Sequence, residues 1–297
     1  MLKRFLSYYK PQMGLFVADT ICALVLAAID LAFPIILRNL CGGLFTQGQA
    51  AIMQALGMIS VGLVLMYAIR CACRYFVSYW GHVMGARMES KMREDLFDQY
   101  ECFSFAYFDR NSSGDMMSRV VNDLFDICEA AHHVPEWIII CGIEIIGSFV
   151  ILFTIAPVLA LAMAVVTTVF AVIMFWQNMR MREVFSDNRK KISGINAQLQ
   201  DSLAGMRVVK SFANEETERA KFRASNDRYL SSKENMYHAM GVYTATYGLL
   251  SGVLYVIVVL LGGWLVAQGQ LQAVDMATFA LYISLFCTPL ETLVNSA

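Results

Sequence analysis

Several segments of this chain run for close to 20 apolar residues, about the length with which an α-helix crosses the roughly 30 Å hydrocarbon core of a bilayer. A segment in hydrocarbon has to satisfy its own backbone hydrogen bonds, which favours helices. The chain is 58% hydrophobic and 16% charged, whereas a soluble domain has about 45–50% apolar and about 25% charged residues. The sequence therefore predicts an all-α membrane protein with several spans. The net charge of −1 gives no indication of nucleic-acid binding.

The positive charges lie at the N-terminus and in two polar stretches, with only Arg38, Arg70 and Arg74 elsewhere. Twelve of the 23 Lys and Arg residues lie between Arg180 and Lys233, and the connections near 41–51, 155–158 and 268–275 contain none. Because Lys and Arg accumulate on the cytoplasmic side, we expect the N-terminus and both polar stretches to be cytoplasmic, in the cell (inner or plasma) membrane. No small-residue cleavage site follows the basic start, so no cleaved signal peptide is expected. The eight cysteines are scattered without paired spacing and are interpreted as reduced packing residues.

The second polar stretch has a helical pattern. Its apolar residues recur at spacings of three, four and seven, which predicts two helices and a turn that leave the membrane and return. The turn, residues 201–215, is where we expect contact with a partner. The first stretch resembles it, because residues 51–104 contain no helix breaker over roughly 54 residues, or about 80 Å, far more than a bilayer requires.

The expected architecture is six transmembrane helices joined into two long cytoplasmic hairpins. The spans are expected at about 12–40, 51–80, 131–155, 158–180, 238–267 and 274–297, with the hairpin turns at 105–114 and 205–216. Pro34 is expected to kink the first span. Residues 2–9 fit either an amphipathic helix along the inner surface or a frayed end. Apolar stripes along the hairpins predict a dimer in which hairpins pack across subunits. The sixth span stops without a basic anchor, as if cut in mid-helix.

Two sequence patterns at the hairpin turns resemble a known family. Phe108-x5-Gly114-x3-Ser118-Arg119-x3-Asp123 is similar to the first intracellular loop of ABC exporters. The second turn is similar to their second loop, and it reads Asp201-x3-Gly205-Met206-x3-Lys210-x-Phe212-x2-Glu215. The family more often has Glu at the position of Asp201. Order, connecting lengths and six-span layout agree over essentially the whole chain.

The resemblance implies the type-IV exporter transmembrane-domain fold, with a domain-swapped dimer built with an identical or a different subunit. Both turns would be coupling helices that dock on nucleotide-binding domains, which would bind ATP and Mg²⁺. No G-x-x-x-x-G-K-[ST] pattern occurs here, so no ATPase site and no cofactor are expected in this chain. The coupling residues implied are Phe108, Asp109, Arg110, Asn111, Gly114, Gly205, Phe212, Asn214 and Glu215.

Some polar residues fall within the apolar runs. A charged side chain in the hydrocarbon core costs free energy. We therefore expect Arg70, Arg74 and Glu144 either to form structural pairs or to line a substrate cavity. Either an apolar cavity or ordinary helix packing would explain the aromatic residues Tyr243, Tyr247 and Phe286. No metal site is expected, since neither the adjacent His132 and His133 nor the other histidines have further ligands at a defined local spacing.

Three functions were compared. The first is the membrane permease part of an ATP-driven exporter that moves a drug, lipid or peptide out of the cytoplasm by alternating access. An ion-coupled secondary transporter would favour inverted repeats and midplane charges, whereas the two hairpins here have parallel topology. A membrane-embedded lipid enzyme needs a catalytic cluster, and no Ser-His-Asp or paired-carboxylate arrangement can be placed from the sequence.

Overall fold

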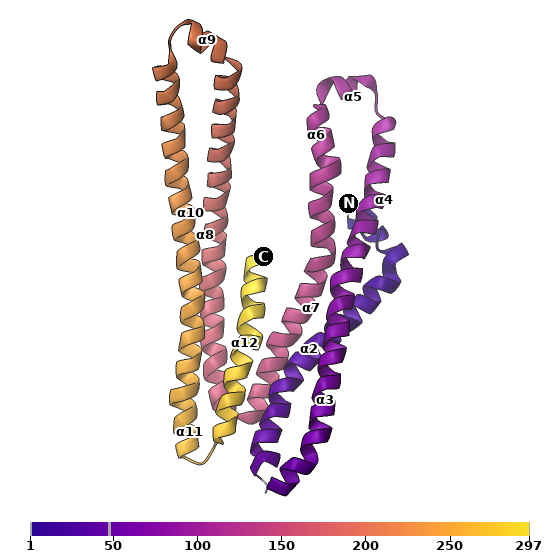
Figure 1. Ribbon diagram of the computed structural model, residues 1–297, viewed down its shortest axis with the longest axis vertical. Helices are drawn as coiled ribbons and strands as arrows, with labels where there is room; N and C mark the ends of the chain where they lie inside the picture. Colours follow the sequence, from indigo (N-terminus) through magenta and orange to yellow (C-terminus); the bar gives the residue numbers. More distant parts are fainter. Residues whose placement is uncertain (1, 47–48, 297) are drawn as a thin grey trace. The chain divides into compact units, whose positions relative to one another are not determined.

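The computed structural model describes residues 2–46 and 49–296, and every regular element within those residues is helical. Figure 1 shows long helices joined by short turns. The chain divides into two compact units. One is formed by the chain up to Ala160 together with the segment from Val258 onward, and the other is Leu161–Ile257.

The first unit contains most of the helices. In chain order they are α1 (Leu2–Ser7), η1 (Lys10–Gln12), α2 (Met13–Gly42), η2 (Leu44–Thr46), α3 (Gln49–Phe76), η3 (Val77–Gly81), α4 (His82–Glu101), α5 (Phe105–Arg110), α6 (Ser113–Ser118), η4 (Arg119–Asp123) and α7 (Leu124–Ile155), then η5 (Val258–Gly262), α11 (Gly263–Ala267) and α12 (Ala273–Ser296). The second unit is built from α8 (Pro157–Ala204), α9 (Met206–Ser211) and α10 (Glu215–Ile257).

The core of the first unit lies where α12 packs against α2 and α7. Phe279, Tyr282 and Phe286 recur at helical spacing on α12, and all three are fully buried. The Tyr282 hydroxyl donates a hydrogen bond to the Leu31 carbonyl of α2 at 2.5 Å. Gly147 of α7 faces α2 so closely that an added Cβ would lie 2.5 Å from Leu31 Cδ1. In lipid, helices associate by such close packing and by interhelical hydrogen bonds rather than by hydrophobic burial.

Two ion pairs connect α2 to its neighbours. Arg70 of α3 donates to both carboxylate oxygens of Asp30, at 2.9 and 3.2 Å. Arg38, near the end of α2, contacts Asp275 of α12 at 2.5 Å. Charges inside an apolar helix are tolerated when they pair in this way.

The N-terminal segment packs on the first hairpin, which consists of α4, α5, α6 and α7. The Tyr9 hydroxyl donates to the Ala131 carbonyl at 2.6 Å, and Tyr9 shares a buried cluster with Met84, Met88 and Cys128. Phe5 of α1 packs against the same cluster, so Leu2–Ser7 is a helix in contact with the hairpin.

The second unit is a hairpin whose two long helices, α8 and α10, lie side by side in Figure 1. The short helix α9 joins them at the tip. Polar cross-links join its helices along their length. Gln177 donates to Thr246 at 3.0 Å, and Asn188 donates to Ser232 at 3.0 Å. Ser202 donates to Glu218 at 2.9 Å near the tip. These contacts fix the register of the two helices.

Six helical stretches of the described residues are long and apolar enough to cross a membrane. This confirms the predicted all-α, six-helix membrane protein. The long stretch expected from residue 51 to about 104 is helical over Gln49–Glu101, a length of 53 residues, with a π-helical segment at Val77–Gly81 that the sequence did not indicate. Cys41 and Gly42, which were expected in an external loop, belong to α2.

Candidate functional site

The tip of the first hairpin is a short helix, α5, set between two turns. Ser104 precedes it in an extended conformation, and Asn111 ends it. The Asn111 side-chain amide donates back to the Tyr107 carbonyl at 2.8 Å. Ser112 then caps α6, because its hydroxyl accepts a hydrogen bond from the Gly114 amide at 3.2 Å. Local hydrogen bonds therefore hold α5 across the end of the hairpin.

Aromatic side chains dominate the surface of this tip. Phe105 is 91% exposed and Phe108 is 43% exposed. Phe108 lines a groove of about 520 Å³ together with side chains from both legs of the hairpin. Tyr107 is half-buried, and its ring centroid lies 4.2 Å from that of Phe103 with the two rings tilted. Phe105 and Phe108 thus place two exposed aromatic rings on one short helix.

The second tip, α9, is fixed by backbone geometry. Gly205 starts it, with its amide donating to the Asp201 carbonyl at 2.9 Å. Ala213 ends it with a φ of 48°, in the left-handed region. The Asn214 amide returns to the Val209 carbonyl at 3.0 Å, which completes the kind of C-terminal cap that usually places Gly at the left-handed position.

Phe212 projects from this second tip and is 79% exposed. A groove of about 410 Å³ adjoins it and is lined by α8, α9 and the start of α10. Lys210 hydrogen-bonds Glu215 at 3.0 Å, which holds the pKa of the Glu215 carboxyl below its usual value. Glu215 also lies in the first turn of α10, where a negative charge is favourable. The tip thus presents one bare aromatic ring beside ordered polar groups.

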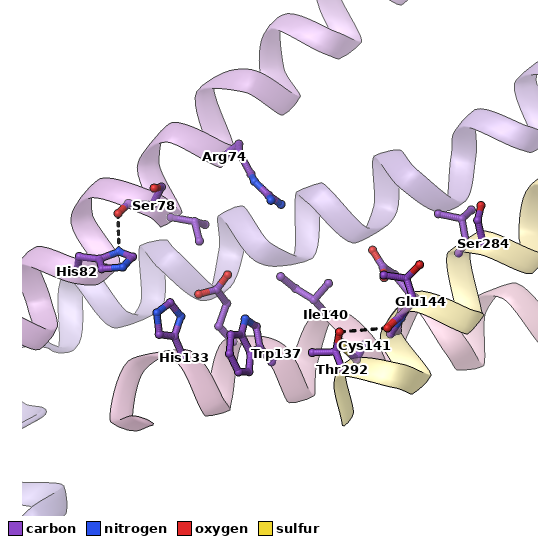
Figure 2. Close-up of a pocket in the computed structure, with 15 residues that line it drawn as sticks. Arg74, Ser78, His82, His133, Trp137, Ile140, Cys141, Glu144, Ser284 and Thr292 are labelled. Atoms are coloured by element: carbon purple, nitrogen blue, oxygen red, sulfur yellow. Dashed lines mark hydrogen bonds between the residues drawn. The ribbon is translucent and has the colours of Figure 1, made fainter. Parts of the chain in front are cut away.

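The first unit also contains a cavity of about 580 Å³ between α3, η3, α4, α7 and α12 (Figure 2). Charged and titratable side chains share it with aromatic and aliphatic ones. The polar contributors are Arg74, Ser78, His82, His133, Glu136, Glu144, Ser284, Thr288 and Thr292. Such a lining matches a molecule with both polar and apolar parts.

The structure separates the residues proposed for a substrate cavity. Arg74 and Glu144 line the cavity together, whereas Arg70 pairs with Asp30. Phe286 is fully buried, with its ring 4.8 Å from Phe149. Tyr243 and Tyr247 lie on α10 in the second unit, and Tyr243 is buried there. Arg70 and Phe286 do not line the cavity of the first unit, and each contacts a neighbouring helix.

Several residues that line this cavity were not predicted from the sequence. Ser284, Thr288 and Thr292 recur every fourth residue on α12, a polar stripe that could have been recognised. His82 and His133 are far apart in sequence, yet their rings approach to 5.1 Å. Only the helix pairing brings them together.

Comparison with known proteins identifies the fold family. Residues 16–290 match the family described as the ABC transporter transmembrane region. The chain belongs to this family. The resemblance drawn from the two turn motifs is therefore confirmed, and neither the secondary transporter nor the lipid enzyme is supported. The family match and the six apolar helices also confirm the prediction of a multi-pass membrane protein.

Individual relatives in the ABC family are longer than this chain. The ABC transporter ATP-binding protein YwjA of Bacillus subtilis is 32% identical over 98% of the chain and 50% of its own length. An ATP-dependent lipid A-core flippase of Shewanella is 26% identical over 77% of the chain and 40% of its own length. The chain spans about half the length of the curated relatives it matches.

Proposed function

We propose that this chain is the membrane-spanning permease part of an ATP-driven exporter, with α5 and α9 as its coupling helices. Nucleotide-binding domains would receive the two tips and close on ATP and Mg²⁺, and the helices would then switch from inward- to outward-facing. The names of the relatives support this proposal, since YwjA is called an ATP-binding protein and the Shewanella protein is called ATP-dependent.

The exposed aromatic rings at the tips carry the proposal. Phe105 and Phe212 are 91% and 79% exposed, on short helices that local hydrogen bonds hold in place. An aromatic side chain gains about 1.5–3 kcal/mol when it moves from water into an apolar pocket. Phe108 belongs to the same short helix as Phe105 and lines a groove at this tip, so we assign it to the same docking surface. Asp109, Arg110, Asn214 and Glu215 would orient the contact.

The cavity of the first unit is the proposed substrate site. Arg74 and Glu144 supply opposite charges, and Trp137, Ile140 and Leu285 supply apolar surface. This lining fits an amphipathic substrate such as a drug, lipid or peptide. The name of the Shewanella relative, a lipid A-core flippase, agrees with a lipid among these classes.

We further propose a dimer in the cell's inner or plasma membrane with a cytoplasmic N-terminus. Exposed apolar side chains of the two-helix unit, such as Val169 and Val172, face either lipid or a second subunit. The same holds for Val259, which lies in the segment just after this unit. Exchange of this hairpin between subunits would cover part of that surface.

The test replaces Phe212 with alanine in the transporter assembled with its nucleotide-binding domains. Transport, substrate-stimulated ATP hydrolysis and thermal stability are measured side by side. We expect transport to fall about tenfold or more, as loss of 1.5–3 kcal/mol of docking energy implies, while the thermal midpoint and substrate binding stay unchanged. Phe105→Ala is expected to behave in the same way.

Phe125→Ala is the matched control, because Phe125 is an exposed ring on the first hairpin away from its tip. Parallel loss of stability and activity in Phe212→Ala would show that the ring is part of the core. Normal coupling in both tip variants would show that α5 and α9 do not transmit force.

A further inference from the structure

Three potential metal ligands converge at one end of the cavity in the first unit. His82 is the first residue of α4, and Glu129 and His133 lie one helical turn apart on α7. One ligand atom from each lies within 4.8 Å of the others. Figure 2 shows His82 and His133 approaching each other from different helices. His133 is four positions after Glu129, so both side chains project from the same face of α7.

The hydrogen bonds of this cluster orient its ligand atoms. Nδ1 of His82 lies 2.6 Å from the Ser78 carbonyl. Because a carbonyl can only accept, Nδ1 carries the proton and Nε2 keeps its lone pair. Histidines that bind metals are usually held by such a contact from the other ring nitrogen. Nε2 of His133 lies 3.3 Å from Glu129 Oε2, so these two groups are already neighbours.

The backbone around the cluster is held in place. Met84 and Met88, which follow His82 on α4, and Cys128, which precedes Glu129 on α7, are buried together in one apolar cluster. The π-helical segment Val77–Gly81 ends directly before His82. A π-bulge rotates the following residues relative to a regular helix and is frequent at functional sites. Here it determines which way His82 faces.

We propose that His82, Glu129 and His133 form a binding site for a divalent transition-metal ion such as Zn²⁺. Two imidazoles and one carboxylate are a donor set that suits Zn²⁺, with a further position open to water or another ligand. Tetrahedral ligands around Zn²⁺ lie about 3.3 Å apart at metal–ligand distances of about 2.0 Å. The three ligand atoms already lie within 4.8 Å of one another, so metal binding would draw them closer together.

The donor types also select the metal class. Imidazole nitrogen favours Zn²⁺, Cu²⁺ and Ni²⁺, whereas Mg²⁺ and Ca²⁺ prefer oxygen ligands. Glu136, three positions after His133 on α7, lines the same cavity. A bound ion would link α4 to α7 at the end of the cavity nearer the α5 tip, and would hold these two helices at one separation.

The experiment measures metal binding to the purified chain in detergent. Zn²⁺ is titrated against a chromophoric chelator, and Co²⁺ is used as an optical probe of coordination. We expect one Zn²⁺ per chain, visible Co²⁺ bands of nitrogen and oxygen coordination, and a higher thermal midpoint with Zn²⁺. Mg²⁺ at the same concentration is expected to leave the midpoint unchanged.

Variants assign the binding to this cluster. His82→Ala, Glu129→Gln and His133→Ala should each weaken Zn²⁺ binding about tenfold or more, as even loss of an orienting partner has an effect of that size. His238→Ala removes an imidazole from the second unit and should bind like the wild type.

All variants keep the eight cysteines, so thiol binding would not change among them. Zn²⁺ affinity that is equal in the wild type and the three variants, or Co²⁺ spectra dominated by thiolate charge transfer, would overturn the proposal. These results do not depend on transport, so the site can fail while the exporter function stands.

Discussion

At the scale of single residues, Ala213 has a conformation that alanine rarely adopts. Its φ of 48° places it in the left-handed region, where a Cβ costs roughly 1–2 kcal/mol. Asn214 and Val209 close the cap around it, so the surrounding hydrogen bonds impose the strain. The position ends α9 and thereby sets the direction in which Phe212 projects. Strained residues of this kind tend to occur at functional sites.

Replacing Ala213 with glycine should relieve this strain. Glycine reaches the left-handed region freely but loses more entropy on folding, so we expect a net stabilisation of up to about 1 kcal/mol. The thermal midpoint of the purified chain measures it. Ala204→Gly, at the end of α8, is the control and should destabilise. A lower midpoint for Ala213→Gly would show that the Cβ makes a contact worth more than the strain.

Sequence reasoning reached only some residues of the candidate site. The motifs placed Phe108 and Phe212 at the tips, and the structure puts both in α5 or directly after α9. Phe105 was missed because nothing in the sequence indicates whether a ring in a short helix is half-buried, as Tyr107 is, or exposed. The sequence predicted no metal site, and the site proposed at His82, Glu129 and His133 was not visible in it, because these side chains meet only when α4 packs along α7.

At the scale of helices, the Arg70–Asp30 pair shows what polar residues inside apolar helices do here. The sequence left structural pairing and substrate contact open, and Arg70 contacts both oxygens of Asp30 across α2 and α3. We expect Arg70→Gln to destabilise the helix pair by about 1–2 kcal/mol, in the upper range of interhelical polar contacts in membranes. Asp30→Asn on the same background should cost little more, because the partner is already lost.

Thermal midpoints of the wild type, both single variants and the double variant give the coupling energy of this pair. Arg74→Gln is the control, since Arg74 lines the cavity and should affect substrate binding more than stability. Additive losses in Arg70 and Asp30 variants would mean that the two residues act independently.

Helix order and length were predictable because hydrophobic runs and charge blocks determine them directly. The predicted turn 205–216 contains α9, and the predicted turn 105–114 contains α5. The π segments and the pairing of α12 with α2 and α7 were not predictable. They depend on side-chain packing, such as Tyr282 against Leu31, which leaves no periodic trace in the sequence.

At the scale of the whole molecule, the charge distribution determines the predicted orientation. Lys and Arg gather on the two hairpins and are absent from the turn between α11 and α12. Moving such charges across a membrane is unfavourable, and the cell retains them in the cytoplasm. Both tips and the N-terminus should therefore lie inside, and residues 268–272 should lie outside.

Cysteine labelling of intact cells checks this orientation. In a background with the eight native cysteines replaced, Ser113→Cys and Asn214→Cys mark the two tips, and both positions are exposed in the structure. We expect a membrane-impermeant maleimide to label neither until the cells are opened. Gln270→Cys, exposed in the turn before α12, should be labelled in intact cells and shows that the reagent reaches the outer face. Labelling of the tips but not of residue 270 would invert the topology and remove the coupling role of α5 and α9, because ATP is available only in the cytoplasm.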